Sequence, residues 1–367
     1  MRIALVSDAW APQVNGVVRT LETTVRTLRR RGHIVETVTP DAYRTVACPS
    51  YPEIRLALAG RRAIGRRLDL FAPDALHIAT EGPLGWAARA WALAEGMPFT
   101  TSFHTRFPDY VAMRTRLPAE WFWPVVRRFH GPAAATMVAT PTLAAELAEN
   151  GIGPTMPWSR GVDLALFTPE GATLDTLARP LQHSGFRRST ARGFSNPMLL
   201  YVGRVAVEKS IDAFLAADVP GTKVVVGDGP ARAMLTARFP DAVFLGPLTG
   251  EPLAAAYRTA DAFVFPSRTD TFGLVMIEAL ASGTPVAALP VPGPLDIIGR
   301  DGHGPAARSP APIGVLDMDL AIAIRRALLL DRAPCAVEGR HYGWDACTDQ
   351  FLAALRPKNG SAFARAA

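Results

Sequence analysis

The sequence predicts an α/β protein built from two doubly wound, parallel-sheet domains. Short apolar segments alternate with segments of helical spacing in both halves of the chain, which is typical of a parallel sheet covered by helices on both faces. The alternation starts a second time near residue 198, with a new first strand. A length of 367 residues also fits two domains of ordinary size better than one core.

The first domain is expected at residues 1–165. Its first strand, residues 3–7, is too short an apolar run for a signal peptide, and Asp8 interrupts it. A helix is expected at residues 17–31, just before Gly32. Further strands are expected at 33–40, 75–80, 99–104 and 133–140, with helices at 83–95 and 141–150.

The second domain is expected at residues 166–340 and repeats this logic. Residues 162–196 contain several Pro, Gly and Arg residues, and we expect them to form the linker and a long loop. A closing helix at 341–356 and a frayed tail at 357–367 are expected to follow. Strands are predicted at 198–203, 222–227, 242–246, 262–266 and 285–289, and helices at 210–217, 231–239, 251–259, 272–282 and 316–330.

Composition narrows the function classes. No segment approaches the ~20 uninterrupted apolar residues that a membrane span needs, so we expect a cytoplasmic protein. Cys48, Cys335 and Cys347 lack metal-binding spacing and are expected to be reduced. Residues 1–165 hold 19 arginines, no lysine and 14 acidic residues, whereas residues 166–367 hold 20 basic and 19 acidic residues. The basic first half favours an anionic partner, and an ordinary solvated surface is the alternative.

The segment from Asp270 to Glu278 carries the strongest local signal. It follows a predicted strand and opens a helix, where an open sheet binds its ligand. Gly273 lets the backbone approach a ligand, and the amides of Phe272 to Val275 suit a phosphate. Glu278 is placed to accept hydrogen bonds from a ribose. In the alternative interpretation Asp270 only caps the helix and Glu278 is a surface charge.

Two cations follow the first strand of the second domain. Gly203 allows a sharp exit from the strand, and Arg204 and Lys209 lie in the loop beyond it. An arginine fork and a lysine point charge there can neutralise a diphosphate. The alternative is an ordinary surface pair with Glu208 as the partner.

Three weaker signals lie at other strand ends. Gly16 directly precedes a helix, and Gly229 lies in a loop that permits backbone contact with a ligand. His104 is placed to donate a hydrogen bond to a substrate hydroxyl, although a lone histidine also occurs as a packing residue. The first loop lacks the glycine fingerprint of dinucleotide-binding proteins, which argues against a nicotinamide dehydrogenase.

Together these segments resemble the retaining glycosyltransferases of family four, which share the GT-B fold of two Rossmann-like halves facing each other across a cleft. The resemblance covers nearly the whole chain and is closest to bacterial diacylglycerol glycosyltransferases and sulfolipid synthases. One position departs from the family signature, because Asp270 stands where the family has glutamate. The matching segments, in order, are Asn15-Gly16, Ser102 to Thr105, Ser159 to Asp163, Val202 to Arg204 with Lys209, Gly227 to Pro230, and Asp270 to Glu278.

The resemblance implies roles for these residues. Arg204 and Lys209 would hold the donor diphosphate, and Gly16 would approach the same phosphate from the opposite domain. Glu278 would bind the ribose, and His104 would contact the donor sugar. Asp270 and the amides of Phe272, Gly273 and Leu274 would position that sugar.

We predict that the reaction needs no metal ion. No Asp-x-Asp pair follows a strand beside the cationic loop, and Arg204, Lys209 and a helix dipole would stabilise the leaving diphosphate. The nucleotide sugar is therefore a substrate, and no cofactor is expected.

A membrane is the expected anionic partner, and a nucleic acid is not. Residues 117–130 combine three adjacent aromatic side chains with two arginines, as interfacial helices do. Arg61, Arg62, Arg66 and Arg67 form a second basic cluster at helical spacing. Internal packing of the aromatic side chains is the alternative. The aromatic residues and arginines of residues 117–130 are Trp121, Phe122, Trp123, Arg127 and Arg128.

The resulting hypothesis is a retaining hexosyltransferase, peripheral on the inner face of the cytoplasmic membrane. It would move a sugar from UDP-glucose or UDP-glucuronic acid to a lipid such as diacylglycerol. The first alternative is a GDP-mannose-dependent mannosyltransferase with a soluble or polysaccharide acceptor. A non-catalytic peripheral membrane protein on the same fold is a more distant one.

Overall fold

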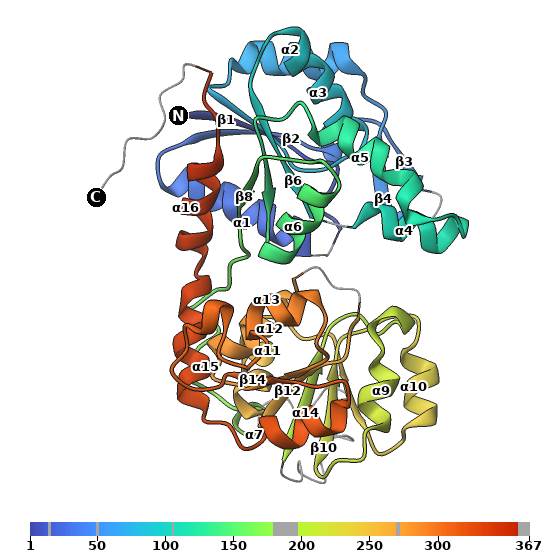
Figure 1. Cartoon of the computed structure of the whole chain (residues 1–367), viewed down its shortest axis with the longest axis vertical. Coiled ribbons are helices and arrows are strands. Elements are labelled where there is room, and N and C mark those ends of the chain that lie inside the picture. Colours follow the sequence, from blue (N-terminus) through green and yellow to red (C-terminus); the bar gives the residue numbers. More distant parts are fainter. Residues whose placement is uncertain (14–15, 49–50, 105, 179–196, 269–271, 359–367) are drawn as a thin grey trace. The chain divides into compact units, whose positions relative to one another are not determined.

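The structure is a computed structural model that describes residues 1–13, 16–48, 51–104, 106–178, 197–268 and 272–358 (Figure 1). The chain divides into two compact units. The first unit comprises Met1–Gly161 and Trp344–Ala367, and the second comprises Val162–Gly343. The C-terminal segment therefore returns to the N-terminal unit.

The first unit is built on a six-stranded parallel sheet in the order β2-β1-β5-β6-β7-β8, so β1 lies between the edge strand β2 and β5. Ile3 of β1 pairs with Val35 on one side and Ala75 on the other. An antiparallel pair, β3 with β4, stands apart from this sheet. The strands are β1 (Arg2–Val6), β2 (Ile34–Val38), β3 (Thr45–Cys48), β4 (Tyr51–Ala57), β5 (Ala75–Ile78), β6 (Phe99–Phe103), β7 (Ala135–Val138) and β8 (Thr155–Pro157).

Helices cover both faces of this sheet. One apolar cluster packs side chains of α2, α3 and α5 against the strands, and another packs α1 and α16. Figure 1 shows α16, in red, beside α1. The helices are α1 (Gly16–Arg30), α2 (Arg61–Phe71), α3 (Pro83–Ala94), α4 (Phe107–Thr115), α5 (Trp123–His130), α6 (Pro141–Glu149) and α16 (Trp344–Ala354), with 3-10 helices η1 (Pro40–Ala42) and η2 (Ala119–Phe122).

The second unit repeats the architecture, with the strand order β11-β10-β9-β12-β13-β14. Its strands are β9 (Met198–Val202), β10 (Thr222–Val226), β11 (Val243–Gly246), β12 (Ala262–Phe265), β13 (Val286–Ala288) and β14 (Gly314–Leu316). Its helices are α7 (Leu174–Ala178), α9 (Ile211–Ala216), α10 (Arg232–Arg238), α11 (Gly250–Thr259), α12 (Leu274–Ala281), α13 (Pro292–Ile298), α14 (Leu320–Ala327) and α15 (Arg332–Gly339), with 3-10 helices η3 (Val207–Lys209), η4 (Pro305–Ala307) and η5 (Arg340–Tyr342).

These two sheets confirm the predicted class of two Rossmann-like, doubly wound parallel-sheet domains. One local prediction was wrong. The helix expected from residue 316 begins at Leu320, because Leu316 pairs in β14 and Asp319 caps the helix through the Ala321 amide at 2.8 Å. The segment expected as linker and long loop contains α7 within its described residues 162–178, where Phe167 and Leu174 are buried. Residues 179–196 lie outside the described part.

Candidate functional site

The carboxyl edge of the second sheet brings the two main predicted motifs to neighbouring strands. β9 and β12 pair directly, and the strand order reverses between them. The loop that carries Arg204 and Lys209 follows β9, and α12 follows β12. A ligand of an open α/β sheet binds at such a reversal.

Backbone contacts fix the loop after β9. The Tyr201 hydroxyl donates to the carbonyl of Arg204 at 2.9 Å, and the amide of Val205 donates to the carbonyl of Asp228 at 2.9 Å. Gly203 has a φ of +153°, and a Cβ there would lie 2.8 Å from the Tyr201 oxygen. The strand exit therefore requires glycine, and the backbone at Arg204 is held in one place.

The loop after β10 packs against this loop through glycines. A Cβ on Gly227 would lie 1.9 Å from the carbonyl oxygen of Gly203, and a Cβ on Gly229 would lie 2.4 Å from that of Val205. Both positions also have positive φ, +135° and +157°. Gly229 thus has a packing role, and its predicted contact with the donor stays a prediction.

The N-terminus of α12 is capped by backbone alone among the described residues. Gly273 is the N-cap in the left-handed region, at φ +86°, and the helix has no side-chain cap. The first-turn amides of an α-helix have no partner within the helix, so those of Leu274 and Val275 are available donors by position. Such a terminus is suited to an anion. Asp270 lies outside the described residues.

Glu278 is buried, with 3% of its surface exposed, so the alternative of a surface charge is wrong. The hydroxyl of Tyr257 donates to its Oε2 at 3.0 Å. Phe272 is also buried and packs edge-on against Tyr342, with ring centroids 6.3 Å apart. Because a buried carboxylate needs hydrogen-bond partners in place of water, Glu278 is better suited to a specific polar contact than to a solvated surface.

His104 lies just beyond β6 in the first unit and is largely buried. Its Nδ1 lies 2.8 Å from Nη2 of Arg160, and its Nε2 lies 2.8 Å from Oγ of Ser102. Burial, and next the charge of Arg160, lower the pKa of His104 well below its ordinary 6.5. The ring is therefore neutral at physiological pH and has protein partners on both nitrogens.

Asp8 is a buried carboxylate that the sequence patterns did not single out. It accepts hydrogen bonds from the amides of Leu84 and Gly85, at 2.9 and 3.2 Å, and so occupies the N-terminus of α3. A Cβ on Gly82 would lie 2.3 Å from its Cγ. Burial raises the pKa of Asp8. Its position directly after β1 is the signal that could have found it. Gly16, which also follows β1, is the first residue of α1.

The aromatic segment is divided between surface and core. Trp121 is 66% exposed, whereas Trp123 stacks on Phe103 with ring centroids 6.2 Å apart. Phe122 is partly buried. The predicted interfacial helix is η2 followed by α5, and Arg127 and Arg128 are exposed on α5.

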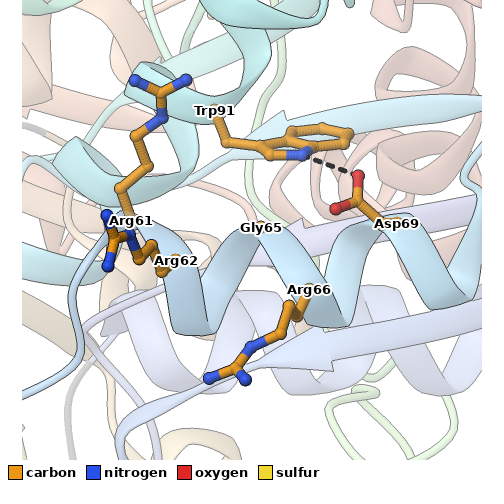
Figure 2. Close-up of a pocket in the computed structure, with 6 residues that line it drawn as sticks. All are labelled: Arg61, Arg62, Gly65, Arg66, Asp69 and Trp91. Carbon is orange, nitrogen blue, oxygen red and sulfur yellow. Dashed lines mark hydrogen bonds between the residues drawn. The ribbon is translucent and has the colours of Figure 1, made fainter.

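A basic pocket lies between α2 and α3 of the first unit (Figure 2). Arg61, Arg62 and Arg66 line it with Trp91, whose indole donates to Asp69 at 2.9 Å. All three arginines are exposed, and none forms an ion pair with the described residues. We call these three side chains the α2 arginines. Arg67, in contrast, pairs with Glu36 at 2.6 Å.

Within the described part of the chain, no helix is long and apolar enough to cross a membrane. The same residues contain no group of three or more His, Cys, Asp or Glu side chains arranged to hold a metal ion. Cys335 and Cys347 are free thiols buried in the core.

Comparison with known proteins places both units in glycosyltransferase families. Residues 14–166 match Glycosyltransferase Family 4, and residues 196–327 match Glycosyl transferases group 1. The solved structure of sucrose-phosphate synthase from Thermosynechococcus elongatus has a TM-score of 0.70 at 23% identity, covering 96% of this chain and 97% of that chain. The expected GT-B fold is thereby confirmed.

Curated relatives differ in the donors and products that their names state. The chain is 34% identical to a GDP-mannose-dependent alpha-mannosyltransferase of Mycolicibacterium smegmatis, over 81% of this chain and 82% of that protein. It is 30% identical to the sulfoquinovosyl transferase SQD2 of Arabidopsis thaliana, over 96% and 74%. It is 27% identical to the alpha-monoglucosyldiacylglycerol synthase of Streptococcus pneumoniae, over 78% and 71%.

Proposed function

The chain belongs to glycosyltransferase family 4 and is a hexosyltransferase of the GT-B fold, and from this premise we propose that it glycosylates a lipid at an anionic membrane surface. The proposed donor is a UDP-sugar, UDP-glucose or UDP-glucuronic acid, and the proposed acceptor is a diacylglycerol-like lipid. The α2 arginines carry the proposal for the acceptor side.

The donor diphosphate is assigned to the carboxyl edge of the second unit. Arg204 and Lys209 supply positive charge from the loop after β9, and the first amides of α12 supply oriented donors. Negative charge grows on the leaving diphosphate as the glycosidic bond breaks. Fixed cations and amides aimed at that charge lower the barrier without reorganising, so the proposed reaction needs no metal ion.

Recognition of the nucleoside and of the sugar is assigned to three further residues. Glu278 is proposed to accept hydrogen bonds from the ribose, and its burial supports a specific contact. Asp270 and His104 are proposed to contact the donor sugar.

The lipid acceptor rests on the unpaired positive charge of the α2 arginines. Arg61 and Arg62 lie in the first turn of α2, where the helix dipole disfavours cations, and the helix has no side-chain cap. The negative charge of an anionic surface would neutralise these arginines and would also interact favourably with the uncapped N-terminus of α2. Exposed Trp121 suits the membrane–water interface, and one relative is named as a diacylglycerol glucoside synthase.

Liposome binding tests the acceptor side. Each arginine near an anionic surface contributes about 1 kcal/mol, so replacing the α2 arginines with glutamine should weaken binding to phosphatidylglycerol vesicles by about 100-fold at low salt. Replacing Arg26 and Arg44, which are exposed elsewhere in the first unit, is the control for lost charge. Equal binding by the wild type and the α2 variant would refute the assignment of this surface.

A GDP-mannose-dependent mannosyltransferase is the second candidate. The relative of that name has the higher identity, 34% against 27% for the diacylglycerol glucoside synthase. Product analysis with UDP-glucose, UDP-glucuronic acid and GDP-mannose, each with diacylglycerol and with soluble mannosides, separates the two. Transfer of mannose alone would overturn the proposed donor.

A further inference from the structure

A chain of buried polar side chains begins at Arg160 and runs across the first sheet. Nη2 of Arg160 lies 2.8 Å from Nδ1 of His104, and Nε2 of His104 lies 2.8 Å from Oγ of Ser102. The same Oγ lies 3.2 Å from Nε2 of His77, whose Nδ1 lies 2.9 Å from Oγ1 of Thr100. All five side chains are buried.

The first two links of this chain have a fixed direction. A guanidinium only donates, so Nδ1 of His104 must accept, and a neutral ring then carries its hydrogen on Nε2. That hydrogen is donated to Ser102. The hydroxyl of Ser102 in turn donates a hydrogen bond to Nε2 of His77 or to the carbonyl oxygen of Ala79, each 3.2 Å away. The tautomer of His104 is the same in both cases.

Burial of Arg160 at this position is energetically unfavourable. Its side chain is buried, and no carboxylate among the described residues pairs with it. Its guanidinium donates instead to the carbonyl of Trp158 at 3.1 Å and lies 5.5 Å from the indole centroid of that residue. Burial lowers the pKa of Arg160 to about 10, so it remains charged at neutral pH. Burying a cation without a counter-charge is unfavourable, which points to a purpose other than stability.

The titratable groups described around His104 favour its neutral form. Burial contributes most, and the permanent charge of Arg160, which follows β8, would repel a positive imidazolium, with smaller contributions in the same direction from His77 on β5 and His130 on α5. His130 itself is bonded to Thr101 at 2.8 Å and to Glu81 at 3.2 Å.

We propose that Arg160 is a positioning residue for sugar transfer, holding His104 in a single orientation and tautomer with Nε2–H as the donor. In the resting protein Ser102 accepts this hydrogen bond, and a hydroxyl of the donor sugar replaces Ser102 on binding. The proposal rests on the proposed contact between His104 and the donor sugar. In the Ser159-Arg160-Gly161 segment, which the sequence singles out only by its family resemblance, the proposed role of Arg160 is to orient His104.

Nitrogen NMR of the unmodified enzyme tests the geometry without any substitution. In protein labelled with ¹⁵N-histidine, and with the signals of His104 identified by their loss in His104→Gln, we expect a neutral ring at pH 5.5. Nε2 should be protonated and Nδ1 bare. A doubly protonated ring, or the opposite tautomer, would overturn the proposal.

Two substitutions at Arg160 test the consequence for catalysis. Misplacement of a catalytic contact by about 1 Å costs on the order of 100-fold, so Arg160→Met should lower kcat by about 10- to 100-fold with little change in the donor KM. It should also move the acidic limb of the pH–rate profile up toward 6.5, the ordinary pKa of histidine. Arg160→Lys keeps a charged donor and should recover most of both losses.

The outcomes separate this inference from the function on which it rests. A merely structural Arg160 would reduce the folded fraction but leave the pH profile and the tautomer of His104 unchanged, and that result would refute the inference. Full activity of His104→Gln would instead refute the proposed sugar contact, and the NMR result would still decide whether Arg160 orients the ring.

Discussion

Acid should weaken the first unit through His77, which is fully buried on β5. Burial lowers its pKa from 6.5 to about 3. The unfolded chain therefore takes up a proton near pH 6.5, whereas the folded chain does not do so until about pH 3. The free energy of unfolding must fall as the pH decreases through this window. Between pH 7.5 and 4.5 His77 alone should lower the free energy of unfolding by about 2.7 kcal/mol. The loss begins near pH 6.5, so it amounts to one proton over about two pH units at about 1.36 kcal/mol for each unit.

Tryptophan fluorescence during urea unfolding is the appropriate assay. All seven tryptophans lie in the first unit, so their emission reports its unfolding and not that of the second unit. His77→Gln is the matched variant, since an amide can bridge Thr100 and Ser102 without titrating in this range. His104 contributes in the same direction in both proteins, so it cancels in the difference.

The stability difference between the wild type and His77→Gln should shift by about 2.7 kcal/mol from pH 7.5 to 4.5, in favour of the variant at low pH. A difference that stays constant with pH would mean that the buried imidazole does not resist protonation, and the reasoning would be wrong.

Three further results are expected. Glu278→Gln should weaken nucleoside diphosphate binding by about 10- to 100-fold, because a hydrogen bond to a charged group is worth about 1.5–3 kcal/mol. Tyr257→Phe removes the hydroxyl that donates to Glu278 and should leave the affinity within about threefold, whereas equal effects of the two substitutions would indicate a packing role for Glu278. Gly229→Ala should lower the melting temperature, since it strains a φ of +157° and brings a Cβ to 2.4 Å from the Val205 carbonyl, at a cost of about 1–3 kcal/mol; an unchanged melting temperature would contradict the loop packing. Turnover should be unaffected by EDTA, and its loss with recovery on adding Mg²⁺ or Mn²⁺ would refute the metal-independent mechanism.

Local periodicity was sufficient to predict the fold class and most sheet strands. Strands such as β9 and β12 are continuous apolar runs bounded by turns, because both of their faces are buried. The pattern did not reveal β14, a strand of three residues of which only Gly314 is buried, or the antiparallel pair of β3 and β4 outside the two six-stranded sheets. Short strands at an edge carry too little periodic signal to be recognised.

The candidate site was predictable where glycine and charge follow a strand. The positions of Gly203 and Arg204 after β9 and of Gly273 after β12 were predicted in this way, and their roles stay predictions. The partnership of Arg160 with His104 was not, because the two residues are 56 positions apart and meet only through the packing of β6, β7 and β8. The burial of Glu278 could not be predicted either. Most residues of α12 are buried, so the sequence of this helix has no polar face from which the exposure of Glu278 could be judged.

Calorimetric titration with UDP and with GDP tests the central claim, that Arg204, Lys209 and the start of α12 form a diphosphate site in the second unit. The wild type should bind one of the two nucleotides, and Lys209→Ala should bind it at least about 10-fold more weakly while retaining its melting temperature, since a charge-assisted contact is lost. Flat titrations with both nucleotides, or unchanged affinity in the folded Lys209→Ala variant, would contradict it.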